Sequence, residues 1–188
     1  WKRARRCMEG CQTLPSRIVK FAVCLKAQLD YHFLMNVAAE IRDPVHGYIY
    51  VSNVEKQVID TPVFQRLRRI RQLSGAYLTY PGAQHSRFEH SVGAMHLAGL
   101  AIKSLASKVS LSDIERQEIK LAALLHDVGH GPFSHLMEEV MVEKRNVTHE
   151  DMTKRVLRET EIQGILVKRG FDAEDLSEFT LGLSAKRR

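Results

Sequence analysis

Cysteine is missing from residues 35–188, since the three cysteines of the chain are Cys7, Cys11 and Cys24. A domain without cysteine cannot rest on a disulfide scaffold, and this composition favours a cytoplasmic protein. Cys7 and Cys11 have the spacing of half a metal knuckle, but no second ligand pair follows at a suitable distance. No apolar run approaches the roughly 20 residues that a bilayer-spanning helix requires. We therefore expect neither a disulfide framework nor a membrane partner.

An excess of positive charge is also missing from the main body of the chain. The formal net charge of the 188 residues is +6, but residues 1–34 alone hold seven Lys and Arg against two Asp and Glu. Residues 35–188 hold 21 basic and 20 acidic side chains. A domain-wide surface for nucleic acid is therefore not supported, and only local basic patches fit this balance. Because the better-organised pattern begins at Met35, we predict an extension over residues 1–34 and one domain over 35–188.

One strand pattern and one helix pattern open this domain. Alternating residues within 41–52, next to a Pro-Val-His-Gly turn, predict a short strand or hairpin. A helix is predicted over 60–73, with Thr61 as its N-cap and Pro62 at its first position. Its apolar residues predict one buried stripe, formed by Val63, Phe64, Leu67, Ile70 and Leu73. Its arginines are expected to face water, namely Arg66, Arg68, Arg69 and Arg71.

Two longer helices follow a Pro-Gly loop at 80–86. The first is predicted over 87–107, with buried positions at Phe88, Val92, Met95 and Leu100. The second begins at a capping box of Ser112 and Glu115. Its apolar positions are Ile114, Ile119, Ala122 and Leu125. The expected fold class is therefore mostly α, with a short N-terminal strand or hairpin.

The segment after the second long helix is rich in turn signals. Gly129 and Gly131 are expected to end that helix with positive φ angles. Pro132 then restarts a helix that runs through Met141. Thr148 with Asp151 predicts the cap of a further helix over 149–160.

The stretch LLHDVGHGPFSH at 124–135 holds the strongest candidate for a site. His126 and Asp127 are adjacent on a helix and point about 100° apart, so both grip one ion only if it lies over the helix edge. His90 on another helix is the best further ligand, and Arg87 shares its face. A metal and a guanidinium together suit a phosphate group. Imidazole favours Mn, Fe, Zn or Ni, while a carboxylate favours harder ions such as Mg.

Simpler interpretations of these residues compete with a site. A lone His-Asp pair usually caps a helix or faces water, and the same holds for His90 alone. His46 is typical of a turn, His96 of a packed position, and His85 fits a pocket or a helix cap equally well. Gln72 precedes a Ser-Gly break, where its side chain can turn inward toward a base or sugar. Proton transfer near neutral pH is expected of three further histidines, His130, His135 and His149.

Several blocks resemble the HD-domain phosphohydrolase superfamily, in the branch of deoxynucleoside triphosphate triphosphohydrolases that includes the enzyme combining a sterile-alpha-motif domain with an HD domain. The resembling text is DPVHGYI, DTPVFQRLRRIRQL, YPGAQHSRFEHSVG, HDVGHGPFSH and THE. The resemblance implies a helical HD fold and a divalent ion bound by His90, His126 and Asp127. It implies further roles around the triphosphate, catalytic for His149, His130 and His135, phosphate-binding for Arg87, and nucleoside-binding for Gln72 and Leu73.

The implied reaction is water attack at the α-phosphate, which yields a nucleoside and inorganic triphosphate. Two alternatives stay open at this point. One is another HD hydrolase, acting on nucleotide monophosphates, cyclic dinucleotides or nucleic-acid ends. The other is a non-catalytic module that senses nucleotides.

The chain departs from the family pattern in two places. The family's fourth metal ligand is a later aspartate, and Asp172 and Asp175 do not match its surroundings. The resemblance therefore predicts a C-terminally truncated domain, with the fourth ligand beyond Arg188. Some family members tetramerise and bind a regulatory nucleotide, so a homo-oligomer is expected. Part of that regulatory pattern is matched by Asp60, Gln65 and Arg68, but Ala39 and Glu40 stand where a lysine is expected.

Overall fold

A computed structural model describes residues 37–133 and 135–182. It is mostly helical with an N-terminal hairpin, which confirms the predicted fold class. The elements are β1 (Val37–Asp43), β2 (Gly47–Ser52), α3 (Asn53–Ile59), α4 (Pro62–Gln65), the 3₁₀ helices η1 (Arg66–Arg69) and η2 (Ala76–Leu78), α5 (Arg87–Leu105), α6 (Asp113–Leu125), α7 (His135–Arg145), α8 (His149–Glu159), α9 (Glu161–Lys168) and α10 (Ala173–Thr180). The predicted extension over residues 1–34 lies outside the described residues.

The hairpin forms where alternation predicted it and begins four residues earlier. Ile41 pairs with Ile49 across the antiparallel strands, and Ile49 and Val51 point into the core. Asp43 stabilises the turn, because its Oδ1 accepts hydrogen bonds from the amides of Val45 and His46, both at 2.8 Å. One face of the hairpin therefore covers the helices.

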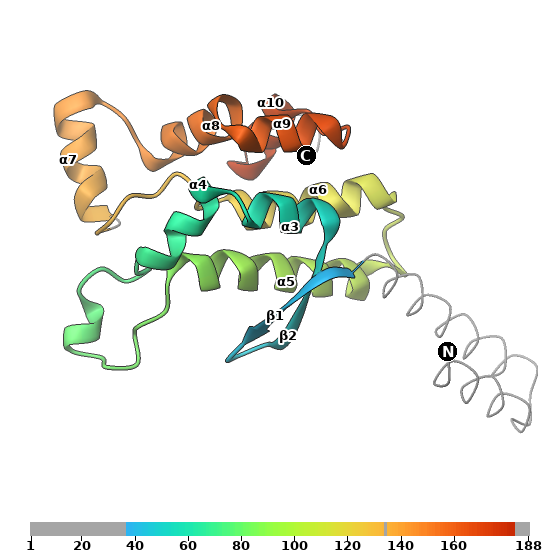
Figure 1. The fold of residues 1–188 in the computed structure, drawn as a ribbon, viewed down its shortest axis with the longest axis horizontal. Coiled ribbons are helices and arrows are strands. Elements are labelled where there is room, and N and C mark those ends of the chain that lie inside the picture. The colour runs from blue at the N-terminus through green and yellow to red at the C-terminus, as the bar shows by residue number, and fades with distance from the viewer. Residues whose placement is uncertain (1–36, 134, 183–188) are drawn as a thin grey trace, which may run out of the picture.

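Two long helices, α5 and α6, lie side by side through the centre of the molecule (Figure 1). Helices α8, α9 and α10 lie on the α6 side, and the hairpin packs toward α5. The predicted capping box at Ser112 is present, and α5 begins with a second one at Ser86 that was not predicted; the two hydroxyls accept from the amides of Glu115 and Glu89. These caps fix the first turn of each helix, and α5 begins next to the site described below.

Two apolar positions that the periodicity placed in the core are exposed instead. Leu100 lies five residues after buried Met95, about 140° around α5, and is 47% exposed. Ile114 shares the face of Leu121 but lies in the first turn of α6, and is 64% exposed. The prediction was wrong at both positions, because Leu100 lies off the buried face of α5 and Ile114, although on the buried face of α6, lies in a first turn that is not covered.

The predicted helix over 60–73 is also shorter than expected. Thr61 caps it, but α4 passes into η1, and the chain becomes extended at Ile70. The reason is a tertiary contact, since the amide of Arg87 donates to Ile70 O at 2.8 Å and the amide of Gln72 donates to His85 O at 3.1 Å. This pairing with the segment before α5 replaces the last helical turns. Leu73 is consequently 46% exposed and does not join the buried stripe.

The glycines after α6 do not act as predicted. Positive φ angles occur at Gly47, Gly170 and Gly182 among the described glycines, and at the non-glycine residues Phe133 and Asn146. Gly129 is needed for a different reason, because a Cβ there would lie 2.2 Å from the backbone nitrogen of Thr153 and 2.4 Å from His149 O. The absent side chain lets the start of α8 approach the turn after α6.

Helices α7 and α8 form near their predicted positions. Helix α7 begins at residue 135 rather than at Pro132 and continues past Met141 to Arg145, because the chain makes a turn at 132–133 before the helix begins. Helix α8 follows the predicted cap, in which Thr148 accepts from the amide of Asp151 at 3.1 Å. Within the described part of the chain, no helix has both the length and the apolar character that a membrane span needs.

Candidate metal centre and catalytic site

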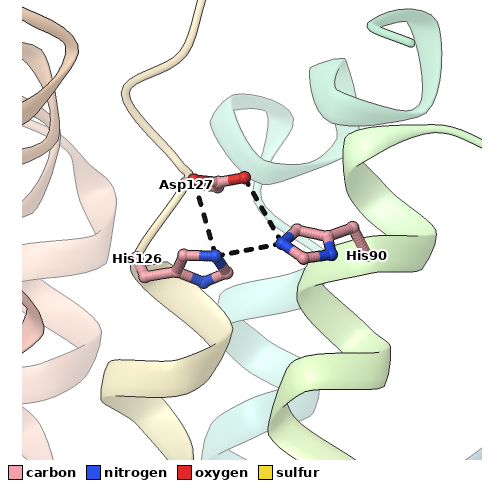
Figure 2. Close-up of side chains that lie close together, drawn as sticks. All are labelled: His90, His126 and Asp127. Carbon is pink, nitrogen blue, oxygen red and sulfur yellow. Dashed lines mark hydrogen bonds and ion pairs between the residues drawn. The ribbon is translucent and has the colours of Figure 1, made fainter. Parts of the chain in front are cut away.

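Three potential metal ligands from two helices meet at one end of the α5–α6 pair (Figure 2). His90 lies in the first turn of α5, His126 caps the C-terminus of α6, and Asp127 follows it. The two histidine Nε2 atoms are 3.2 Å apart. His90 Nε2 lies 3.6 Å from Oδ2 of Asp127, and His126 Nε2 lies 3.5 Å from Oδ1. Donors about 2.1 Å from one ion lie about 3.0 Å apart at right angles and about 3.4 Å apart at tetrahedral angles, so this spacing fits a shared divalent ion.

Hydrogen bonding and burial also suit the two histidines to metal binding. His126 Nδ1 lies 2.9 Å from Ala123 O, and because a carbonyl only accepts, Nδ1 donates there and Nε2 is the nitrogen that faces His90. Burial is the main cause that lowers the pKa of His90. Asp127 opposes this shift, and His126 and Arg87 add to it. The lowered pKa of His90 favours its neutral form, which is the form that binds a metal.

Arg87 lies against the ligand carboxylate rather than apart from it. Its Nη1 donates to Oδ2 of Asp127, and both side chains are nearly buried. The guanidinium compensates the carboxylate charge and limits the rotation of the side chain, as hydrogen bonds to metal-binding carboxylates do. The histidines are more open, with side-chain exposures of 33% for His90 and 32% for His126. A ligand can therefore approach from the histidine side.

The turn after α6 is fixed from both sides by its backbone. Arg66 donates to His130 O at 2.7 Å and also to Val128 O. On the other side, the amide of Gly129 donates to Thr153 Oγ1 at 3.1 Å, and this hydroxyl donates to His149 O at 3.0 Å. The expectation that Arg66 faces water was therefore wrong, because its guanidinium binds carbonyl groups more than 60 residues away in sequence.

The other arginines of this segment lie nearer to solvent. Arg68 is exposed, but its Cζ lies 3.5 Å from the centroid of the Phe88 ring. The Cζ of Arg71 lies 3.9 Å from the centroid of the Tyr77 ring. Cation–π contacts of this kind keep a guanidinium near the surface while packing its flat face on an aromatic ring. The prediction of solvent exposure is thus confirmed for Arg68 and Arg71.

A second group of side chains continues from Asp127 toward α8. His130 is 3% exposed, and its Nε2 lies 3.5 Å from Oδ1 of Asp127. Its ring stacks on that of His149 with centroids 4.1 Å apart, and His149 Nδ1 lies 2.5 Å from Glu138 Oε1. Burial, followed by the charge of Arg87, lowers the pKa of His130 to about 4. His130 is therefore neutral at pH 7 and has no charge with which to repel a bound cation.

Glu138 is the residue of this group that sequence reasoning missed. It belongs to α7, eleven residues before His149, and it also accepts from the amide of His149 at 3.2 Å. No short-range pattern marks it, since α7 carries several acidic residues and the contact forms only when α7 and α8 meet across the 146–148 loop. The predicted catalytic residue His135 begins α7, but its side chain lies outside what the structure describes.

The predicted nucleoside contacts lie at the approach to α5. Gln72 Oε1 lies 2.7 Å from His85 Nε2, and the charge of His85 contributes to the lowered pKa of His90. Gln72 and His85 are therefore neighbours of the ligand group, so His85 lies at the site. Leu73, the next residue after Gln72, is about half exposed. Whether these residues bind a nucleoside stays a prediction.

The three residues of the predicted regulatory pattern are only partly brought together. Arg68 Nε donates to Gln65 Oε1 at 2.7 Å, and Gln65 Nε2 donates to Ile59 O at 2.7 Å. Asp60 forms an ion pair with Lys56 instead. Arg68 also lines a groove of about 330 Å³ between the hairpin turn and the start of α5, whose charged lining residues include Arg42, Asp43 and Glu89.

The fourth carboxylate ligand is not present in the described part of the chain. Asp172 caps α10, with its Oδ1 accepting from the amides of Glu174 at 2.8 Å and Asp175 at 3.3 Å. Within residues 37–133 and 135–182, the metal-ligating group consists of His90, His126 and Asp127. Asp172 and Asp175 lie outside this group.

Comparisons with known proteins agree with this geometry. The family model of the HD domain matches residues 87–179. A chicken protein named deoxynucleoside triphosphate triphosphohydrolase SAMHD1 is 42% identical over 138 residues, covering 72% of this chain and 22% of the chicken protein. The uncharacterized protein YwfO of Bacillus subtilis is 43% identical over 130 residues, covering 68% of this chain and 29% of YwfO. A solved phosphohydrolase from Bacteroides thetaiotaomicron is 35% identical with a TM-score of 0.67, covering 79% of this chain and 36% of that one. The chain thus spans about a quarter of the length of these two curated relatives and about a third of the length of the solved one.

Proposed function

Because this chain belongs to the HD-domain phosphohydrolase superfamily, we propose that the protein hydrolyses deoxynucleoside triphosphates to nucleosides and inorganic triphosphate. The observation that carries the proposal is the group of His90, His126 and Asp127, with Arg87 beside it. A divalent ion at these donors would supply positive charge that polarises a phosphoryl oxygen. Its identity among Mg, Mn, Fe, Zn and Ni is left to measurement.

The second group supplies the proton chemistry in this proposal. Water adds to the α-phosphorus and loses a proton to the solvent, the bond from this phosphorus to the 5′ oxygen breaks, and His149 donates a proton to the leaving 5′ oxygen. Glu138 orients the imidazole through Nδ1 and stabilises the positive charge that the ring carries before transfer. His130, neutral at pH 7, packs on the flat face of His149 and fixes the plane of the ring. The result is one proton donor with a set orientation, close to the metal ligands.

Substrate contacts come from residues around the opening of the site. Arg87 donates to Asp127, and we propose that its guanidinium also binds a phosphate oxygen of the substrate. Gln72 and Leu73 contact the nucleoside, and His135 adds a further imidazole near the triphosphate. The pair of Gln65 and Arg68 supports a regulatory nucleotide site in the adjacent groove, to which Asp60 would turn from Lys56.

The proposal is tested by product analysis of the intact protein that contains this chain. It is incubated with each of the four deoxynucleoside triphosphates and Mn²⁺ or Mg²⁺, and the products are separated by chromatography and identified by ³¹P NMR. We expect nucleoside and triphosphate in equal amounts, and none after treatment with a chelator. Release of a monophosphate with pyrophosphate, or metal-loaded protein without turnover, would contradict the proposal. The protein is assayed in parallel with cyclic dinucleotides and nucleic-acid ends. Hydrolysis of one of these, in place of deoxynucleoside triphosphates, would identify it as an HD hydrolase of another specificity.

Replacing Glu138 with glutamine tests the role of the second group. The amide keeps the size of the side chain but removes the charge that stabilises protonated His149, so kcat should fall about 10-fold to 100-fold. KM and metal content should stay within about twofold of the wild type, because Glu138 touches neither phosphate nor metal in the proposed arrangement. Steady-state kinetics and elemental analysis measure both. Glu139→Gln, at the next and exposed position of α7, is the matched control, and equal losses in both variants would argue against a role for Glu138.

A further inference from the structure

Arg66 makes the longest-range contact with the turn that carries the site. Its guanidinium reaches from η1 to two carbonyl groups, His130 O at 2.7 Å and Val128 O. The side chain is partly buried, and burial lowers the pKa of Arg66 without removing the charge at neutral pH. These are charge-assisted hydrogen bonds, which are roughly twice as strong as neutral ones.

The two carbonyl groups lie in the turn after α6, where helical hydrogen bonds no longer fix the backbone. Helix α6 ends at Leu125, so the following peptide groups need partners from elsewhere in the fold. Asp127 begins this segment and His130 ends it, and both face the metal site. A small rotation of the Val128 or His130 peptide would therefore move a metal ligand and the ring that stacks on His149.

We propose that Arg66 is a positioning residue, whose two-pronged hydrogen bond to Val128 O and His130 O holds Asp127 and His130 in the geometry that binds the metal. This inference rests on the proposed metal centre, and it assigns to η1 a role that acts on the metal ligands through the backbone of the turn after α6. Lysine cannot replace this function, because its single ammonium group lacks the planar fork that spans two carbonyls.

A purely structural arginine would behave differently from a positioning one. Loss of structural packing lowers the free energy of unfolding and leaves the metal affinity of the folded fraction unchanged. Loss of positioning lowers the metal affinity of a protein that is still folded. Removal of groups that orient metal ligands typically lowers metal affinity about 10-fold to 100-fold, and we expect that range for Arg66→Lys.

The test measures Mn²⁺ affinity by calorimetry and by electron paramagnetic resonance in the intact protein, its Arg66→Lys variant and its Arg69→Lys variant. Arg69 lies exposed on the same 3₁₀ helix and is the matched control. We expect weaker Mn²⁺ binding only in Arg66→Lys. Its circular dichroism spectrum, and its melting temperature after removal of metal by a chelator, should equal those of Arg69→Lys. In Arg66→Ala, added guanidinium ion at concentrations well below those that unfold proteins should restore part of the affinity.

Wild-type Mn²⁺ affinity in Arg66→Lys would overturn the inference, as would equal losses in Arg66→Lys and Arg69→Lys. If Arg66→Ala does not fold, Arg66→Lys decides alone. The result is separable from the proposed reaction. Weakened Mn²⁺ binding in a protein that hydrolyses no deoxynucleotide would support the role of Arg66 and refute the substrate, whereas a wild type that binds no Mn²⁺ refutes the metal centre and this inference with it.

Discussion

Asp127→Asn is expected to lower the affinity for divalent metal by more than about 100-fold, beyond the loss that follows removal of a group that only orients a ligand. The carboxylate offers one oxygen toward each histidine, and asparagine removes the negative charge while keeping the shape. Without a bound ion, the same substitution leaves Arg87 buried opposite an uncharged amide. Breaking a buried ion pair in this way costs about 3 kcal/mol, so stability should fall together with metal binding.

Two further variants separate these effects. The double variant Arg87→Met with Asp127→Asn also removes the buried guanidinium, so it should regain stability but not metal affinity. Asp172→Asn is the matched control. It makes the same change at a carboxylate that lies outside the ligand group and caps α10. Elemental analysis and urea unfolding measure the two quantities. Wild-type metal content in Asp127→Asn would defeat the assignment of this ligand.

Gly129→Ala is expected to destabilise the fold by more than about 3 kcal/mol and to abolish turnover, because the new Cβ would overlap backbone atoms of α8. The nearest atoms, at 2.2 Å and 2.4 Å, belong to the main chain of Thr153 and His149, so no side-chain rotation relieves the overlap. Helix α8 must move away, which breaks the bond from Gly129 to Thr153 and separates His149 from His130. Urea unfolding gives the stability, and kcat reports the separation of the two rings.

Gly164→Ala provides the matched control for this prediction. Gly164 lies within α9, and a Cβ there would meet nothing within 4 Å. Alanine at an open helical position stabilises a helix by roughly 0.5–1 kcal/mol relative to glycine. The two substitutions should therefore change the free energy of unfolding in opposite directions. Equal free energies of unfolding in the two variants would show that the backbone of α8 does not lie in contact with Gly129.

Local sequence signals predicted the elements whose ends are closed by local hydrogen bonds. The capping box at Ser112 predicts the start of α6, and the Thr148 cap predicts the start of α8, because each motif acts within four residues. The ligand group was predicted from the spacing of polar residues and from family resemblance. Its geometry, with donors from α5 and α6 meeting at one point, confirms that His90, His126 and Asp127 come together.

Three features that sequence did not reveal depend on contacts between distant segments. The helix predicted to continue to Leu73 stops early because Ile70 and Gln72 bond the segment before α5. Arg66 looked like a solvated arginine, since nothing near it in sequence indicates the carbonyl groups it binds. Gly129 was expected to adopt an unusual φ, whereas the structure uses its missing side chain. In each case the decisive partner lies far along the chain, where periodicity and propensity carry no information.

The division of the ligands between α5 and α6 makes a bound ion a cross-link within the chain. His90 and His126 are 36 residues apart in sequence, so an ion held by both closes a loop that includes the connection between the two helices. The unfolded chain has no such preformed ligand set, and the ion therefore binds the folded state in preference to the unfolded one. Metal concentration should thus set the melting temperature of this protein as well as its catalytic state, and depletion of metal would make the same molecule easier to unfold and to degrade.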